Sequence, residues 1–401
     1  MSNSSSSSVK ALGSVPVQRA FHLAWRQLQY DKVRFITATL GVIFACVLVF
    51  MQIGFKNALF ESATLLQRTM TGDIYMIEDQ SEALWRLVPF PRRYLYKALS
   101  VEGVEDVTAL YASQTPWKNP MTGVNRTALV LGIDPRSTVY NLPGLREVQE
   151  KLHMHDAVLF DEYSRPEFGP VKDMVEKNGV FSAEIGGKQL DVVDTFRMGI
   201  TFSADGNIIV KDTTFFKIFP NKSADGIDVG IVSLQKGADI ETAKNKIRSL
   251  LPENILVLNR EEYIEEEKAY WNDITPIGYI FNFGVIMGLI VGFVIVYQVL
   301  FNDINNHLHE YATLKAIGYD DYYFTKVVIS ASIILAVGGY IPGFLICAVL
   351  YKIVESSIFI EMDLNFIKAI TTFVLISSMC FLSGLLAIRK LKSANPVDVF
   401  Q

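Results

Sequence analysis

The chain has 401 residues, of which half are apolar and 20% are charged, and its mean hydropathy is +0.26. This composition is too apolar for an ordinary soluble enzyme and too polar for a bundle of membrane helices alone, so it favours a few spans plus a soluble domain. The formal net charge of −5 gives no indication of nucleic-acid binding.

The N-terminal region predicts a disordered start and then a surface helix. Residues 1–15 are rich in serine, which is typical of disorder. Over residues 16–34 apolar side chains mark one helical face and basic side chains lie elsewhere. We therefore expect an interfacial helix on the cytoplasmic leaflet, with a cytosolic extension of the first span as an equal alternative.

Four apolar segments are long enough to cross a bilayer as helices, which takes about 20 residues each. They are residues 35–55, 276–301, 327–351 and 367–388. Lysine and arginine are concentrated before the first span and after the last, so both termini are predicted to be cytoplasmic. No small-residue cleavage site follows the first span, which favours an uncleaved anchor over a signal peptide.

The predicted fold class is a membrane protein with four transmembrane helices and a large periplasmic α+β domain between the first and second. Residues 56–275 supply that domain, with helical stalks at both ends, and we expect two small subdomains. The remaining segments are a cytoplasmic loop at 302–326, a short periplasmic loop at 352–366 and a cytoplasmic tail at 389–401.

Local patterns predict several elements inside the α+β region. Asn259 and Glu262 have the spacing of a capping box that begins the last helix before the second span. The expected strands are 127–134, 156–162, 188–196, 206–210, 226–234 and 254–259, and the expected helices are 239–251 and 260–271.

Glycines in the spans indicate close helix packing. Gly284, Gly288 and Gly292 recur every four residues and share one helix face, so a partner helix can approach closely. That partner is either the first span of the same chain or the same segment of a second copy. Gly339 and Gly343 indicate a further contact in the third span, where a proline between them favours a kink.

The sequence contains no recognisable catalytic constellation. It has no phosphate-binding loop and no hydrolase or kinase motif, and charged residues are absent from the middle of the spans. His153 and His155 could both face a metal, but two ligands without a third make a weak site. We therefore predict no catalytic, cofactor-binding or metal-binding residue, and any ATP used would be hydrolysed by another chain.

A compact polar helix, HEYATLKAIGYDD at 309–321, is predicted in the loop between the second and third spans. Gly318 would end it as a C-terminal cap. A helix linked to two spans can pass a displacement to both. The alternative is an interfacial helix that only closes the loop.

This segment resembles the cytoplasmic signature of FtsX/MacB-type ABC permeases, and the tail SANPVDVF at 393–400 is similar to that family's C-terminal motif. Further stretches resemble the DevC branch of ABC exporter permeases. They are LAWRQLQYDKVRF, FMQIGFKNALFESA, LVLGIDP, FDEYSRPEFGP, TFSADGNIIV and HEYATLKAIGY.

The resemblance implies the architecture of type VII ABC transporters and a non-catalytic, homodimeric permease in the inner membrane of a Gram-negative-type bacterium, with a cyanobacterial origin. It implies that the dimer contact falls on the first two spans. It places a coupling helix for the ATPase at His309, Glu310, Tyr311, Leu314, Lys315, Ala316 and Gly318.

The implied partners are a DevA-type ABC ATPase that holds ATP and magnesium, a DevB-type membrane fusion protein and a TolC-like outer-membrane channel. The implied cargo is glycolipid, another lipid or an amphiphile, driven outward by motion of the periplasmic domain. Two alternatives share the fold: an FtsX-like mechanotransmitter that regulates cell-wall hydrolysis, and a lipoprotein-releasing permease. A third is a membrane-anchored receptor without an ATPase.

Overall fold

The computed structural model describes residues 17–202, 204–319, 321–358, 360 and 362–393. The predictions for residues 1–15 and 394–401 lie outside this part of the chain. The chain divides into two compact units. The helical unit comprises Met1–Asn57, Tyr279–Ile358 and Met362–Gln401, and the α+β domain comprises Ala58–Gly278 with Phe359–Glu361.

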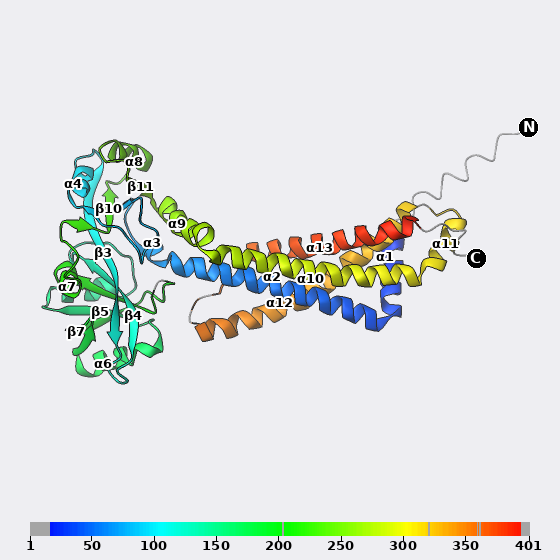
Figure 1. The fold of residues 1–401 in the computed structure, drawn as a ribbon, viewed down its shortest axis with the longest axis horizontal. Coiled ribbons are helices and arrows are strands. Elements are labelled where there is room, and N and C mark those ends of the chain that lie inside the picture. The colour runs from blue at the N-terminus through cyan, green and yellow to red at the C-terminus, as the bar shows by residue number, and fades with distance from the viewer. Residues whose placement is uncertain (1–16, 203, 320, 359, 361, 394–401) are drawn as a thin grey trace, which may run out of the picture. The chain divides into compact units, whose positions relative to one another are not determined.

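Six helices belong wholly or mainly to the helical unit, and they are drawn in Figure 1. They are α1 (Val17–Tyr30), α2 (Lys32–Ala63), α10 (Pro276–Asn306), α11 (Leu308–Ala316), α12 (Asp321–Ile358) and α13 (Phe366–Ser393). By length and hydropathy, α2, α10, α12 and α13 can each cross a membrane. The four predicted spans lie inside these helices, which continue beyond the apolar stretches at one or both ends.

The predicted helix at 16–34 is interrupted at Asp31. Helix α1 ends at Tyr30, and α2 begins at Lys32. The Asp31 side chain accepts a hydrogen bond from the backbone N–H of Arg34 at 3.2 Å, so it caps the start of α2. The helix that precedes the first span and the first span itself are therefore separate helices.

A nine-stranded mixed sheet forms the centre of the α+β domain. Its strand order is β11-β1-β10-β3-β4-β8-β5-β7-β6. The strands are β1 (Ile74–Glu78), β3 (Val104–Lys118), β4 (Asn125–Ile133), β5 (Ala157–Asp161), β6 (Phe181–Ile185), β7 (Lys188–Phe196), β8 (Gly206–Lys211), β10 (Val229–Leu234) and β11 (Ile255–Asn259), with a small separate pair, β2 (Phe90–Pro91) and β9 (Gly226–Ile227).

Strand β3 joins the two halves of this sheet. Its first part pairs with β10, and the part from Tyr111 onward pairs with β4. We expected two small subdomains, and that expectation is wrong. A strand of 15 residues is long enough to belong to both halves, so one continuous sheet results.

The sheet has a core on each face because successive strand residues point in opposite directions. On β1, Ile74 and Met76 pack in one cluster, whereas Tyr75 and Ile77 pack in the other. The first cluster also holds apolar residues of α4 (Arg93–Leu99), α6 (Val171–Asn178), α7 (Asp212–Ile218) and α8 (Ile240–Ser249), and the second those of α3 (Leu65–Thr69), α5 (Leu145–Val148) and α9 (Arg260–Ala269).

Most of the predicted elements are present. The six predicted strands correspond to β4, β5, β7, β8, β9 with β10, and β11. The capping box is confirmed: Asn259 accepts from the Glu262 backbone N–H, and Glu262 accepts from the Asn259 backbone N–H, both at 2.9 Å. Helix α9 then ends earlier than predicted, because Tyr270–Ile274 forms a π-helix before α10.

Candidate functional site

Helix α11 lies between α10 and α12 in the sequence and ends in a defined cap. The backbone N–H of Tyr319 donates to the carbonyl of Leu314, and that of Gly318 donates to the carbonyl of Lys315, each at 3.1 Å. This pair of bonds is the Schellman motif. Gly318 has φ +105°, a conformation that glycine adopts without the Cβ clash of other residues. The predicted cap is therefore confirmed.

Tyr311 anchors α11 within the helical unit. Its side chain is 3% exposed, and its hydroxyl donates to the side-chain oxygen of Gln27 in α1 at 3.1 Å. Its ring meets Phe324 of α12 edge-on, with centroids 5.3 Å apart. Burial raises the pKa of Tyr311 well above its usual value, so the hydroxyl remains a donor at neutral pH. One side chain thus connects α11 to two other helices.

The opposite side of α11 is exposed. Glu310, Thr313 and Ile317 follow one another at helical spacing, and Ile317 is 68% exposed. We refer to these three residues as the outer face of α11. His309 is exposed, and Leu314 and Lys315 are half-buried. Ala316 ends the helix, and its side chain is not among those described.

The glycines of α10 face α2 of the same chain. A Cβ placed on Gly288 would lie 3.2 Å from the Cβ of Leu48, and one on Gly292 would lie 2.6 Å from the Cβ of Ala45. A Cβ on Gly284 would lie 2.4 Å from the Gln52 side chain. The contact positions on α2 fall as those on α10 rise, so these helices run antiparallel.

The glycines of α12 also face α2. A Cβ on Gly339 would lie 2.4 Å from Val42, and one on Gly343 would lie 2.9 Å from Cys46. The contact positions on α2 rise as those on α12 rise, so these two helices run parallel. Helix α12 remains one helix through its internal proline. Small residues therefore allow two apolar helices to pack closely on α2.

A buried carboxylate lies where the α+β domain continues into the apolar helices. Glu267 of α9 is 4% exposed and accepts three hydrogen bonds. The donors are the Gln67 side chain of α3 at 2.9 Å, the Leu84 backbone N–H at 3.1 Å and the Trp271 indole at 2.9 Å. Burial raises the pKa of Glu267 to about 7, although these donors favour the ionised form.

The hydrogen bond from Gln67 to the Glu267 carboxylate links the two ends of the domain. Gln67 lies in the short helix that follows α2, and Glu267 lies in the helix that precedes α10. Tyr263 lies one helical turn before Glu267 and Trp271 one turn after it, and both side chains are also buried. Sequence reasoning missed the site because the run EEYIEEEK reads as a solvated acidic face.

The described residues contain no group of three or more histidine, cysteine, aspartate or glutamate side chains that could hold a metal. Within the same described ranges His155 pairs only with a neighbouring aspartate, its Nδ1 lying 3.0 Å from Asp156.

Residues 282–396 match the family model FtsX-like permease C-terminal. The matched region includes most of α10, all of α11 and α12, and α13. It contains every residue of the predicted coupling helix and all five glycines described above. This match supports the FtsX-like part of the predicted resemblance. No curated protein sequence matches the chain.

Two of the solved structures that are similar to this chain show the level of likeness. One is the extracellular domain of the noncanonic ABC-type transporter YknZ from Gram-positive bacteria, at 12% identity, with a TM-score of 0.32 and coverage of 47% of this chain and 100% of that one. The other is the periplasmic region of MacB from Actinobacillus actinomycetemcomitans, at 11% identity, with a TM-score of 0.34 and coverage of 48% and 91%. Similarities at this level carry no inference about partners or cargo.

Proposed function

We propose that this chain is the permease subunit of an ATP-driven export complex and that α11 receives motion from a separate ATPase. The observation that carries the proposal is the construction of α11. One buried tyrosine holds the helix to α1 and α12, a glycine cap ends it, and its outer face is exposed.

Chain connectivity gives this helix its mechanical role. Only His307 separates α11 from α10, and a short turn separates it from α12. A displacement of α11 is therefore passed directly to two apolar helices. One of them, α10, is preceded by the π-helix and α9 of the α+β domain. Work done on α11 would reach that domain through covalent structure.

The finer proposal is a DevC-type exporter in an inner membrane, with both termini cytoplasmic. Its partners would be a DevA-type ATPase, which holds ATP and magnesium, a DevB-type fusion protein and a TolC-like channel. Its cargo would be a glycolipid or another amphiphile. The branch motifs quoted above, including SRPEFGP and FSADGN, support this assignment.

The proposal includes a homodimer, and the packing of the helical unit restricts how it can form. The glycine face of α10 already contacts α2 of the same chain. A second copy would therefore use another face of these helices. Exposed apolar side chains on α10, such as Ile286 and Ile290, are available for such a contact.

Capture of the full chain from its native membranes, followed by identification of the associated proteins, tests the proposal. We expect a nucleotide-binding subunit whose ATPase activity depends on the permease. The double variant Glu310→Ala with Ile317→Ala should retain its thermal unfolding temperature and lose at least tenfold of that stimulated activity. Glu355→Ala, an exposed carboxylate near the other end of α12, is the matched control.

Three results would contradict the proposal. The wild-type chain could be isolated without any nucleotide-binding subunit, which would favour a receptor. The outer-face variant could support the same ATPase activity as the control. A cell-wall hydrolase captured in place of a membrane fusion protein would favour the mechanotransmitter and would exclude export.

A further inference from the structure

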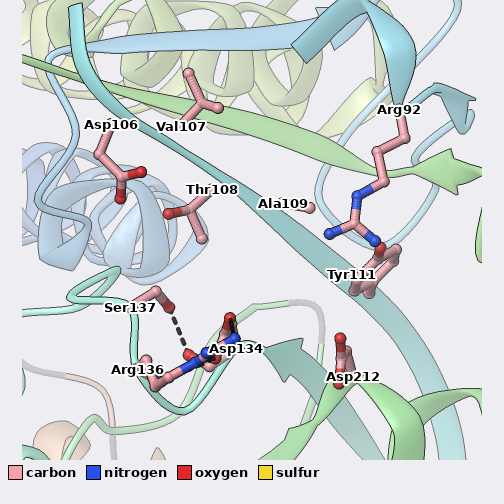
Figure 2. A pocket seen from close by; sticks show the side chains of 10 residues that line it. All are labelled: Arg92, Asp106, Val107, Thr108, Ala109, Tyr111, Asp134, Arg136, Ser137 and Asp212. Carbon is pink, nitrogen blue, oxygen red and sulfur yellow. Dashed lines mark hydrogen bonds and ion pairs between the residues drawn. The ribbon is translucent and has the colours of Figure 1, made fainter. Parts of the chain in front are cut away.

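A polar cavity lies in the α+β domain and is lined by residues of that domain alone. It has a volume of about 360 Å³, within the size range of small-molecule sites. Its walls come from β3, from the loop after β4, from the start of α7 and from Arg92 between β2 and α4 (Figure 2).

Arg92 reaches this cavity without a protein partner for its charge. Its Nε atom is buried and makes no hydrogen bond with any described residue. Within the described ranges no carboxylate oxygen lies within 4.0 Å of its guanidinium. Its guanidinium carbon lies 5.9 Å from the centroid of the Tyr96 ring. A buried guanidinium nitrogen without an acceptor is costly, so an acceptor group on a ligand in this cavity would be favoured there.

Tyr111 presents a second unused donor at the same end of the cavity. Its side chain is 2% exposed, and its hydroxyl makes no hydrogen bond to the described part of the chain. Phe215 and Phe216 hold its ring, with centroid distances of 5.6 and 4.9 Å. Burial raises the pKa of Tyr111 while the Arg92 charge opposes this, so the hydroxyl keeps its proton.

Asp212, which is half-buried, supplies an opposite charge on the cavity wall, and the exposed Asp106 of β3 supplies another. Asp212 begins α7, and its Oδ1 accepts the backbone N–H of Thr213 at 2.7 Å. No basic side chain in the described ranges lies within 4.0 Å of it. Arg136, across the cavity, is already engaged by Asp134 at 3.0 Å. Asp212 and Arg92 therefore face one cavity with unpaired charges that do not meet.

We propose that this cavity binds a small zwitterion, whose acidic group contacts Arg92 and Tyr111 and whose ammonium group contacts Asp212. A ligand with only one charge would leave either the guanidinium or the carboxylate uncompensated in a partly buried site. A neutral polyol would leave both the guanidinium and the carboxylate uncompensated. The same chemistry occurs in free amino acids or short peptides and in the phosphoethanolamine headgroup of a lipid.

Calorimetric titration of the purified full chain tests this inference. The probes are the dipeptide Ala-Ala, O-phosphoethanolamine, and nanodiscs that contain phosphatidylethanolamine. We expect at least one to bind, and Arg92→Gln to weaken that binding at least tenfold. Arg93→Gln is the matched control, because the adjacent arginine does not line the cavity. Binding of the dipeptide identifies a peptide source, and competition by the nanodiscs identifies a lipid source.

Tyr111→Phe separates ligand binding from folding. It keeps the ring between Phe215 and Phe216 and removes only a hydroxyl that has no protein partner. We expect an unchanged or higher unfolding temperature, together with weaker binding. The proposal is overturned if no probe binds, if Arg92→Gln binds as tightly as Arg93→Gln, or if N-acetyl-Ala-Ala and Ala-Ala-amide bind as tightly as the dipeptide. These outcomes do not depend on any ATPase partner.

Discussion

The pH dependence of the α+β domain should be controlled by Glu267. Its pKa is raised from its ordinary value of 4.5 to about 7 in the folded chain. In the unfolded chain the carboxyl ionises at the ordinary value, so between these pH values the folded state holds more protons than the unfolded state. The free energy of unfolding must therefore fall as the pH rises through this window.

The size of the effect follows from the shift. A difference of one pKa unit corresponds to about 1.4 kcal/mol, so this carboxyl alone should remove about 3 kcal/mol of stability between pH 4.5 and 7. Below pH 4.5 the carboxyl is protonated in both the folded and the unfolded state, so its full stabilisation of the fold is present. Above pH 7 both are ionised and the loss stays constant.

Denaturant unfolding of the full chain in detergent, followed by tryptophan fluorescence across this pH range, measures the effect. Glu267→Gln cannot ionise, so the difference between wild type and variant should change by about 3 kcal/mol across the window. Glu265→Gln is the control, since this carboxylate on the same helix is 73% exposed. Equal pH slopes for wild type and Glu267→Gln would refute the reasoning, as would a difference of the opposite sign.

Three further substitutions test the packing. Trp117→Ala empties a fully buried position and should cost about 3–5 kcal/mol in denaturant unfolding; a loss under about 1 kcal/mol would contradict this core. Gly339→Ala should lower the unfolding temperature in detergent by placing a Cβ 2.4 Å from Val42, whereas the adjacent Gly338→Ala, with no atom within 4 Å, should leave it unchanged or higher. Gly318→Ala should speed hydrogen exchange across α11, since φ is +105° there; unchanged protection would count against the cap.

The helical unit could be predicted well because its signals are local. A run of apolar residues long enough to cross a bilayer is visible without any knowledge of its neighbours. The cap at Gly318 and the box formed by Asn259 and Glu262 are also local, and both are present. The glycine series predicted a close helix contact, but its spacing could not reveal that α2 of the same chain makes it.

The sheet was less predictable where pairing partners are distant in sequence. All five residues of β1 are buried, so it lacks the alternation that marks a half-buried strand. Strand β3 contains polar residues and Pro116 and reads as loop, although it joins both halves of the sheet. The cavity was not predictable either, because only this non-local pairing brings Arg92, Tyr111 and Asp212 to the wall of one cavity.

The covalent connections through α2 and through α10 differ in how they would accept a change of length. Helix α2 is unbroken over 32 residues, so one inserted residue would rotate everything after it by about 100° and advance it by about 1.5 Å. The connection through α10 contains the π-helix Tyr270–Ile274, a form that already accommodates a surplus residue. Relatives of this chain should therefore keep the length of α2 constant. The segment that contains the π-helix should vary in length by single residues.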